Sequence, residues 1–194
     1  QASFTVTHVE RVTGLTDALM DSIPIVCITG QVPTHLIGND AFQECDTVGI
    51  TRPCTKHNYL VKNVNDLARI LHEAFYVATN GRPGPVVVDV PKDIQNTIVP
   101  DPDFDPPMDL PGYRLPDAPD AEKVKLAAAA IKAAKKPIVY CGGGVIASDA
   151  AAELREFVQK TGIPVAMTLQ GLGSIPSDHY LSLGMLGMHG TVYS

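Results

Sequence analysis

Residues 63–90 read NVNDLARILHEAFYVATNGRPGPVVVDV, a helical pattern followed directly by a strand pattern. Asn63 and Asp66 have the spacing of a capping box that opens a helix. Gly81 suits the left-handed position that closes one. The run Pro85–Val90 is typical of a strand buried on both faces of a parallel sheet. The apolar residues between cap and stop recur at helical spacing and predict one buried stripe: Leu67, Ile70, Leu71, Ala74, Phe75 and Ala78.

The same alternation continues on both sides of this stretch. Upstream, residues 15–19 have helical spacing, and the apolar run PIVCITG at residues 24–30 predicts another strand buried on both faces. Downstream, residues 120–135 and 148–161 are helix-like, and residues 137–141 and 163–168 are strand-like. Strands that alternate with helices predict an α/β fold with parallel sheets flanked by helices.

A proline-rich stretch divides the chain. Between Pro100 and Pro119 there are seven prolines and five aspartates, so no regular element is expected there. We interpret residues 1–97 as a first unit, residues 98–118 as an extended linker and residues 119–194 as a second unit. Each unit shows only two strongly buried strands, whereas open sheets usually have about four to six. We therefore expect the chain to be a segment of a longer polypeptide.

Composition narrows the class of protein. The 194 residues are 45% hydrophobic and 19% charged, with 15 basic and 21 acidic residues and a formal net charge of −6. These values exclude a disordered acidic tail, and the absence of a basic cluster argues against a nucleic-acid partner. No apolar run reaches the roughly 18 residues that a membrane span needs. The cysteines form no C-x-x-C pair, which favours reduced thiols in a reducing compartment: Cys27, Cys45, Cys54 and Cys141.

Glycine-rich loops follow several predicted strands, at the edge where open α/β sheets place ligands. They are residues 30–33 (GQVP), 141–144 (CGGG) and 168–173 (TLQGLG). Glycine allows a phosphate or flexible cofactor to approach the backbone, but ordinary turns also use glycine and proline. Lys56, Lys92 and Arg82 are cations at loop or strand ends and are equally compatible with a solvated surface. The spacing of the histidines and acids predicts no metal site. The residues alone therefore favour a cofactor-binding α/β protein and leave plain turns as the alternative.

Several strings, in their order along the chain, resemble the catalytic subunit of the acetolactate synthase (acetohydroxyacid synthase) family of thiamine-diphosphate enzymes. The more specific ones are residues 40–44 (DAFQE) and 185–190 (MLGMHG), whereas residues 81–85 (GRPGP) and 90–93 (VPKD) are widespread in thiamine-dependent enzymes. The resemblance runs from about residue 12 to residue 194.

The resemblance implies a fold and an activity. The family has a pyrimidine-binding, a central and a diphosphate-binding domain, so residues 1–97 would end the first and residues 119–194 would open the Rossmann-like, FAD-binding second. Members condense two pyruvates, or pyruvate and 2-oxobutyrate, with release of CO2 in branched-chain amino-acid synthesis. Their cofactors are thiamine diphosphate, Mg2+ and FAD. A homodimer or homotetramer with a regulatory small subunit is expected, in the bacterial cytoplasm or in plastids or mitochondria.

The resemblance also implies site residues. Gln43 would lie by thiamine, and the substrate pocket and its channel would include Pro33, Ala41, Phe42, Lys56 and Lys92. FAD contacts are expected from Arg82, Gly143, Thr168, Leu169, Leu186, Gly187, Met188 and His189. Arg82 offers a planar cation for the pyrophosphate or ring system of FAD. A lysine in the channel would attract the pyruvate carboxylate.

Departures from the family limit what this chain is expected to do alone. The family's thiamine-activating Glu has no counterpart here, since the upstream acid Glu10 lies in a stretch that does not match. The Gly-Asp-Gly…Asn motif that binds magnesium is also missing, so no catalytic residue and no metal ligand is assigned and the chain alone is expected to be inactive. Two alternatives stay open: another thiamine-dependent carboligase or decarboxylase such as glyoxylate carboligase, and a non-catalytic flavin- or nucleotide-binding module.

Overall fold

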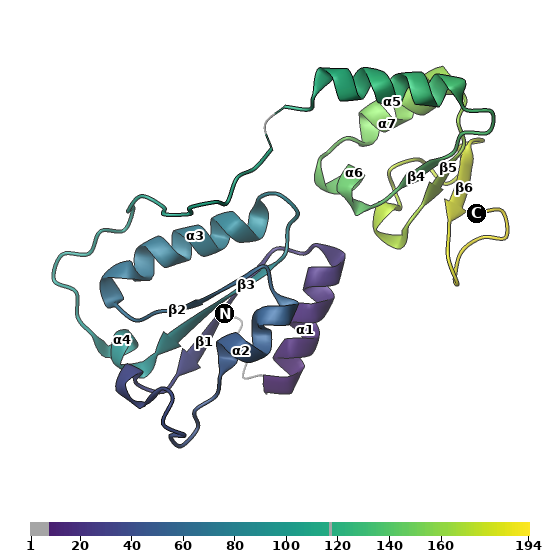
Figure 1. Ribbon diagram of the computed structural model, residues 1–194. Helices are drawn as coiled ribbons and strands as arrows, with labels where there is room; N and C mark the ends of the chain where they lie inside the picture. The colour runs from purple at the N-terminus through teal and green to yellow at the C-terminus, as the bar shows by residue number, and fades with distance from the viewer. Residues whose placement is uncertain (1–7, 117) are drawn as a thin grey trace. The chain divides into compact units, whose positions relative to one another are not determined.

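A computed structural model describes residues 8–116 and 118–194; for residues 8–11 it describes the backbone only. The chain divides into two compact units, the first ending at Leu115 and the second beginning at Pro116. Each unit is built on a parallel sheet of three strands with helices packed beside it (Figure 1). This architecture confirms the predicted α/β fold.

The sheet of unit 1 contains β1 (Ile25–Gln31), β2 (His57–Leu60) and β3 (Pro85–Pro91) in the order β1-β3-β2. Both pairings are parallel. All seven residues of the central strand β3 are buried, as its valine run predicts. The strand β2 was not predicted, because its four residues HNYL carry little apolar pattern.

The prediction that β1 is buried on both faces was wrong. β1 lies at the edge of the described sheet, and Thr29 is its one buried residue. Ile25 is 40% exposed and Ile28 is 60% exposed. An apolar run reports how hydrophobic a strand is, but it does not report how many neighbours cover it.

Helices cover both faces of this sheet (Figure 1). They are α1 (His8–Asp21), α2 (Thr47–Thr51), α3 (Leu67–Thr79) and α4 (Lys92–Asn96), with short 3-10 turns η1 (Thr34–Leu36), η2 (Arg52–Cys54) and η3 (Val64–Asp66). Side chains alternate across a strand, so Val86, Val88 and Val90 pack in the α3 core while Val87 packs with Leu15 of α1.

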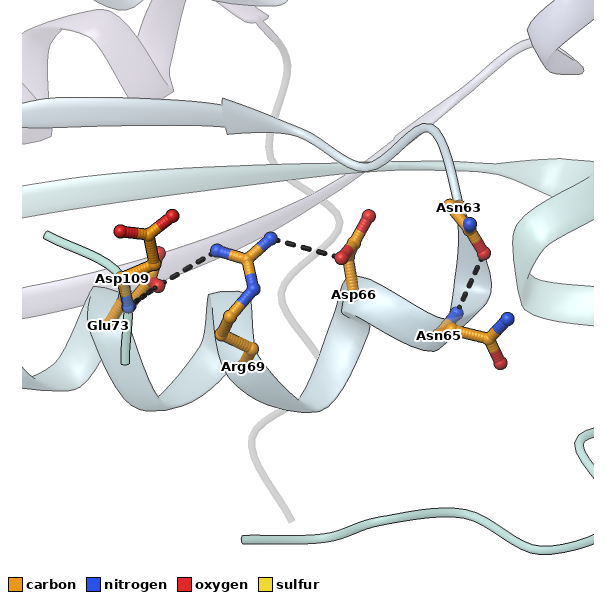
Figure 2. Close-up of polar contacts among 6 residues, drawn as sticks. All are labelled: Asn63, Asn65, Asp66, Arg69, Glu73 and Asp109. Carbon is orange, nitrogen blue, oxygen red and sulfur yellow. Dashed lines mark hydrogen bonds and ion pairs between the residues drawn. The ribbon is translucent and has the colours of Figure 1, made fainter. Parts of the chain in front are cut away.

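Two details of α3 differ from the sequence pattern. The buried stripe includes Val77, whereas Phe75 is exposed. Asn63 and Asp66 do not form a capping box, since the Asn63 side chain accepts a hydrogen bond from Asn65 N at 3.0 Å (Figure 2). Asp66 instead pairs with Arg69 at 3.0 Å. The helix is closed by Gly81 at φ +64°, as predicted.

The sheet of unit 2 contains β4 (Val139–Cys141), β5 (Val165–Met167) and β6 (Ser182–Met185) in the order β4-β5-β6, all parallel. Its helices are α5 (Ala121–Ala133), α6 (Gly143–Ala147) and α7 (Ala151–Thr161), with the 3-10 turn η4 (Leu169–Gly171). The core joins α7 to the sheet through Cys141, Val158, Val165, Met167 and Ile175.

Unit 2 departs from the sequence pattern at its ends. Asp120 caps α5 at the start of the predicted helix 120–135, its side chain accepting from Glu122 N at 2.9 Å and Lys123 N at 3.3 Å. The strand β6 was not predicted; it has an irregular register beside Gly184 at φ +80°. The helix predicted from residue 148 begins at Ala151, because residue 148 still closes the short helix α6.

The proline-rich segment contains no helix or strand among its described residues, 98–116 and 118. Its later part nevertheless belongs to unit 1, because Leu110 and Tyr113 pack against the α3 core. Asp109 N donates to Glu73 Oε1 at 2.8 Å, and the Tyr113 hydroxyl donates to Asn80 O at 2.9 Å. We call residues 109–113 the strap. The two compact units therefore divide after Leu115, within the predicted linker of residues 98–118.

Candidate functional site

Three loops of unit 2 leave neighbouring strands at the same edge of the sheet. Cys141, Met167 and Met185 are in register across β4, β5 and β6. Thr168 N donates to Cys141 O at 2.9 Å, and Leu186 N donates to Met167 O at 3.0 Å, so each loop starts beside the next. The structure thus brings together the predicted FAD residues of unit 2: Gly143, Thr168, Leu169, Leu186, Gly187, Met188 and His189.

Glycine is required where the first two of these loops meet. A Cβ at Gly143 would lie 2.9 Å from Cβ of Gln170, and one at Gly171 would lie 2.7 Å from Cys141 O. Thr168 Oγ1 accepts from Gly171 N at 3.1 Å and holds the second loop in a tight turn. These glycines therefore have a packing role, since they let the two loops approach each other without a steric clash.

Apolar side chains stand exposed on this edge. Leu169 is 67% exposed and Met188 is 91% exposed. Met188 sits on a turn that Gly187 opens at φ +102° and that Thr191 N closes by donating to Met185 O at 2.8 Å. Ordered turns that present apolar side chains are suited to cover a flat apolar ring.

The corresponding edge of unit 1 is organised around a buried acid that the sequence analysis did not single out. Asp89, on β3, is 1% exposed. Its Oδ1 accepts from Thr29 Oγ1 at 2.6 Å, and its Oδ2 accepts from Gln31 Nε2 at 3.0 Å. Gln31 Nε2 also donates to Cys45 O at 2.6 Å, which ties both ends of the loop between residues 31 and 45 to the strand end. The sequence signal that could have revealed this site is the aspartate within the valine run of β3.

The structure brings Pro33 and Lys92 to the same edge. Gln31 and Pro91 are paired at the ends of β1 and β3, so Pro33 and Lys92 follow adjacent strand ends. Thr34 N donates to Asp93 Oδ1 at 3.0 Å and Thr34 Oγ1 donates to Asp93 Oδ2 at 2.5 Å, which locks the two loops together. The Thr34 hydroxyl lowers the pKa of Asp93. Lys92 is exposed at the first residue of α4.

The tip of the 31–45 loop carries the other predicted residues. Phe42 is 90% exposed, and Gln43 is exposed with φ +66°, an uncommon conformation for a residue with a side chain. Ala41 N donates to Glu44 Oε2 at 2.9 Å, and Gly38 N donates to Glu44 Oε1. These backbone bonds, chiefly the one from Gly38, lower the pKa of Glu44. The tip is ordered from within while Phe42 and Gln43 face outward.

Lys56 lies elsewhere in unit 1. Its backbone N donates to Pro85 O at 2.8 Å, which places it at the start of β3 and away from Pro33 and Lys92 at the other end. Its ammonium donates to Val77 O and, at 2.8 Å, to Asn80 O, so it caps the last turn of α3. Within unit 1, therefore, the structure does not bring Lys56 together with the other predicted channel residues.

Arg82 also has structural partners. Its Nε donates to Ser22 Oγ at 2.8 Å, and its Nη2 donates to Met20 O at 3.0 Å and to Leu19 O at 3.3 Å. These bonds satisfy carbonyl groups at the end of α1. Arg82 belongs to unit 1, whereas the other predicted FAD residues belong to unit 2. The sequence analysis did not anticipate this capping role.

The described residues contain no group of three or more His, Cys, Asp or Glu side chains that could hold a metal ion. Glu10 lies in α1 and not on a strand. None of the four cysteines forms a disulfide, and burial raises the pKa of Cys141. In the part of the chain that the structure covers, no helix is both long and apolar enough to cross a membrane.

Both units are similar in sequence to known proteins. Residues 124–194 match the family model described as thiamine pyrophosphate enzyme, central domain. The chain is 57% identical over 185 residues to acetolactate synthase 2, chloroplastic, of Nicotiana tabacum, covering 94% of this chain and 27% of the relative. It is 56% identical over 185 residues to acetolactate synthase, chloroplastic, of Arabidopsis thaliana, with the same coverage.

A bacterial relative agrees with the plant ones. The chain is 55% identical over 183 residues to the acetolactate synthase large subunit of Corynebacterium glutamicum, covering 93% of this chain and 29% of the relative. The chain thus spans little more than a quarter of the length of these relatives. Residues 124–194 of unit 2 are thus similar to the thiamine pyrophosphate enzyme central domain, and nearly all of the chain is similar to one stretch of the acetolactate synthases.

Proposed function

We propose that the natural protein to which this chain belongs is an acetolactate synthase. It would condense two pyruvates, or pyruvate with 2-oxobutyrate, and release CO2, in branched-chain amino-acid synthesis. The observation that supports this proposal is 55–57% identity to acetolactate synthases over 93–94% of the chain, from plants and from a bacterium. The reaction belongs to the whole protein, of which the chain supplies a part.

Within that protein we assign domain roles to the two units. Residues 1–97 would end the pyrimidine-binding domain, residues 98–118 would connect it, and residues 119–194 would open the central FAD-binding domain. The central-domain match over residues 124–194 supports the last assignment. The strap adds a structural detail, since the connecting segment packs on the first unit up to Leu115.

The loops at the edge of unit 2 suit FAD. Gly143, which follows β4, would lie beside its pyrophosphate, and the exposed apolar side chains of Leu169 and Met188 would lie against its rings. Thr168 and the turn from Leu186 to His189 would complete the contacts. Arg82 would supply a cation for FAD, in addition to capping α1.

The loop of unit 1 would serve thiamine and substrate. Thiamine diphosphate, when bound, would supply the electron sink that decarboxylation of a 2-oxo acid needs. Gln43 would lie beside it, while Pro33, Ala41 and Phe42 would wall the substrate pocket. The ammonium of Lys92 is exposed and would attract the pyruvate carboxylate. Lys56 would line the channel only at a position separate from Pro33 and Lys92, because it lies at the other end of β3. Mg2+ would be held by residues outside this chain.

Activity of the purified natural protein tests the proposal. With thiamine diphosphate, Mg2+ and FAD, it should form acetolactate from pyruvate. Lys92→Ala should raise KM for pyruvate about tenfold, at the low end of the value of a charge-assisted hydrogen bond, while Lys62→Ala, which removes another exposed lysine, should not. Preference for glyoxylate would indicate another carboligase. FAD or nucleotide binding without carboligation would indicate a non-catalytic module.

We further propose that the catalytic subunits form a homodimer or homotetramer that binds a regulatory small subunit. The name of the bacterial relative, a large subunit, supports the existence of a smaller partner there. A bacterial source would place the protein in the cytoplasm, and a plant source would place it in the plastid, as the chloroplastic relatives suggest. Light scattering with size-exclusion chromatography would measure the assembly.

A further inference from the structure

The residues that we propose for thiamine and substrate in unit 1 lie mainly on one loop. The loop leaves β1 at Gln31 and ends at Cys45, shortly before α2. Pro33 lies near its start, and Phe42 and Gln43 lie exposed at its tip. The structure describes all of residues 32–45, and among them only the three residues of η1 belong to a helix or strand. Hydrogen bonds from side chains must therefore fix the position of the tip.

The side-chain amide of Gln31 joins the two ends of this loop to the sheet. Its Nε2 donates to Asp89 Oδ2 at 3.0 Å and to Cys45 O at 2.6 Å, and its Oε1 accepts from Val32 N at 2.9 Å. A glutamine amide has two donor hydrogens and one acceptor oxygen, so Gln31 uses both donors and the acceptor. Asp89 lies on the fully buried strand β3, and Thr29 Oγ1 donates to its other oxygen at 2.6 Å. Gln31 is thus fixed on the most rigid strand of the unit.

The other polar contacts of the loop each stiffen one part of it. Thr34 bonds to Asp93 near the start, and Glu44 bonds to backbone N–H groups within the tip. The bond from Gln31 to Cys45 instead joins residues that are 14 positions apart. Loss of the Gln31 amide would therefore let the tip move relative to the start of the loop, while each part kept its own shape.

We infer that Gln31 is a positioning residue, whose side-chain amide holds the loop of residues 31–45 in the shape that binds thiamine diphosphate and the 2-oxo acid. The inference rests on the proposed function of this loop. A loop held closed before the ligand arrives spares binding the free-energy cost of ordering it. Where the closed form is only partly populated, the apparent dissociation constant rises by the inverse of its fraction. Gln31 would act on the cofactor through Gln43 and on the substrate through Phe42.

Gln31→Met tests this role in the purified natural protein with Mg2+ and FAD. Methionine keeps the length of the side chain but removes all three hydrogen bonds. The dissociation constant of thiamine diphosphate, measured by titration calorimetry, should rise at least about twofold, the factor for a weak neutral hydrogen bond. KM for pyruvate should rise as well. In contrast, kcat at saturating cofactor and substrate should change little, because the bound ligands restore the closed loop.

Two further variants sharpen the test. Gln31→Glu keeps an acceptor for Val32 N but loses both donors, so it should raise the same two constants. Gln95→Met is the matched control, because Gln95 Nε2 donates to Val90 O at 2.7 Å. It removes another glutamine amide from the end of β3, from outside the loop, and should leave both constants unchanged.

Three results would overturn the inference. They are unchanged constants in either Gln31 variant, equal shifts in Gln95→Met, and a lower kcat with unchanged constants, which is the pattern of a smaller folded fraction. The melting temperature of each variant monitors folding. The dissociation constant is measured without turnover, so it is separate from the proposed reaction. A natural protein that binds thiamine diphosphate but forms another product would refute that reaction, while the shift in Gln31→Met would still support the positioning role.

Discussion

Replacing Glu73 by alanine should loosen the strap. The Glu73 carboxylate is almost completely buried and accepts two hydrogen bonds, one of them from Asp109 N in the strap. Hydrogen bonds to charged groups contribute about 1.5–3 kcal/mol each. Glu73→Ala removes this acceptor and leaves Asp109 N without it, while Arg69 keeps Asp66 at 3.0 Å. The free energy that holds the strap closed should therefore fall by about 1.5–3 kcal/mol.

Hydrogen–deuterium exchange measured by mass spectrometry suits this test, because it reports local opening free energies in a protein of several domains. The predicted loss corresponds to exchange roughly 10- to 150-fold faster in a peptide spanning residues 105–115. Glu73→Gln keeps an acceptor oxygen without the charge and should give a smaller increase.

Glu122→Ala is the control for this experiment. Glu122 also pairs with a cation on its own helix, Lys125 at 2.9 Å, but its side chain is 77% exposed. Such exposed pairs contribute at most about 1 kcal/mol. If strap exchange were unchanged in Glu73→Ala, or equally fast in Glu122→Ala, the assignment of Glu73 as the anchor of the strap would be refuted.

Three further predictions concern the site loops. The pKa of Glu44 is lowered in the folded protein, so its stabilising bonds to Gly38 and Ala41 are present at neutral pH and lost as the pH falls through that pKa. Hydrogen exchange of loop 38–44, corrected for intrinsic rates, should therefore accelerate in acid. A corrected exchange rate that does not change with pH would contradict this. Arg82→Ala should lower the flavin content of the natural protein and also fray the end of α1, whereas equal loss of FAD and thiamine would indicate general destabilisation. The 194-residue chain alone should form no acetolactate above the free-cofactor background, and measurable product would disprove this.

The sequence predicted the elements whose signal is local. The valines of β3 and the Gly81 stop identify a central strand and the end of a helix without reference to any distant residue. The strand β2 could not be found in this way, because its four residues HNYL have little apolar pattern and its pairing depends on the distant strand β3. Similarly, the exposure of Ile28 depends on the position of β1 in the sheet and not on its composition.

The same distinction applies to the candidate site. The loops after β4 and β5 could be predicted, because glycines at strand ends are visible in the sequence. The bond between Gln31 and Asp89 spans 58 residues and requires the parallel register of β1 on β3. The capping roles of Lys56 and Arg82 likewise depend on which helix ends lie beside them, so isolated cations in the sequence could not reveal them.

The position of β1 has a consequence for how the protein behaves at high concentration. Residues 25–29 read IVCIT, a β-branched stretch without proline or charge. Segments of this kind form cross-β fibrils when identical copies stack on an open edge. In the described sheet β1 pairs only with β3, and Lys or Pro, the residues that usually protect such an edge, are absent from the strand. The 194-residue chain should therefore be prone to amyloid-like assembly through β1, and Ile28→Lys would place a charge on the exposed face of that edge.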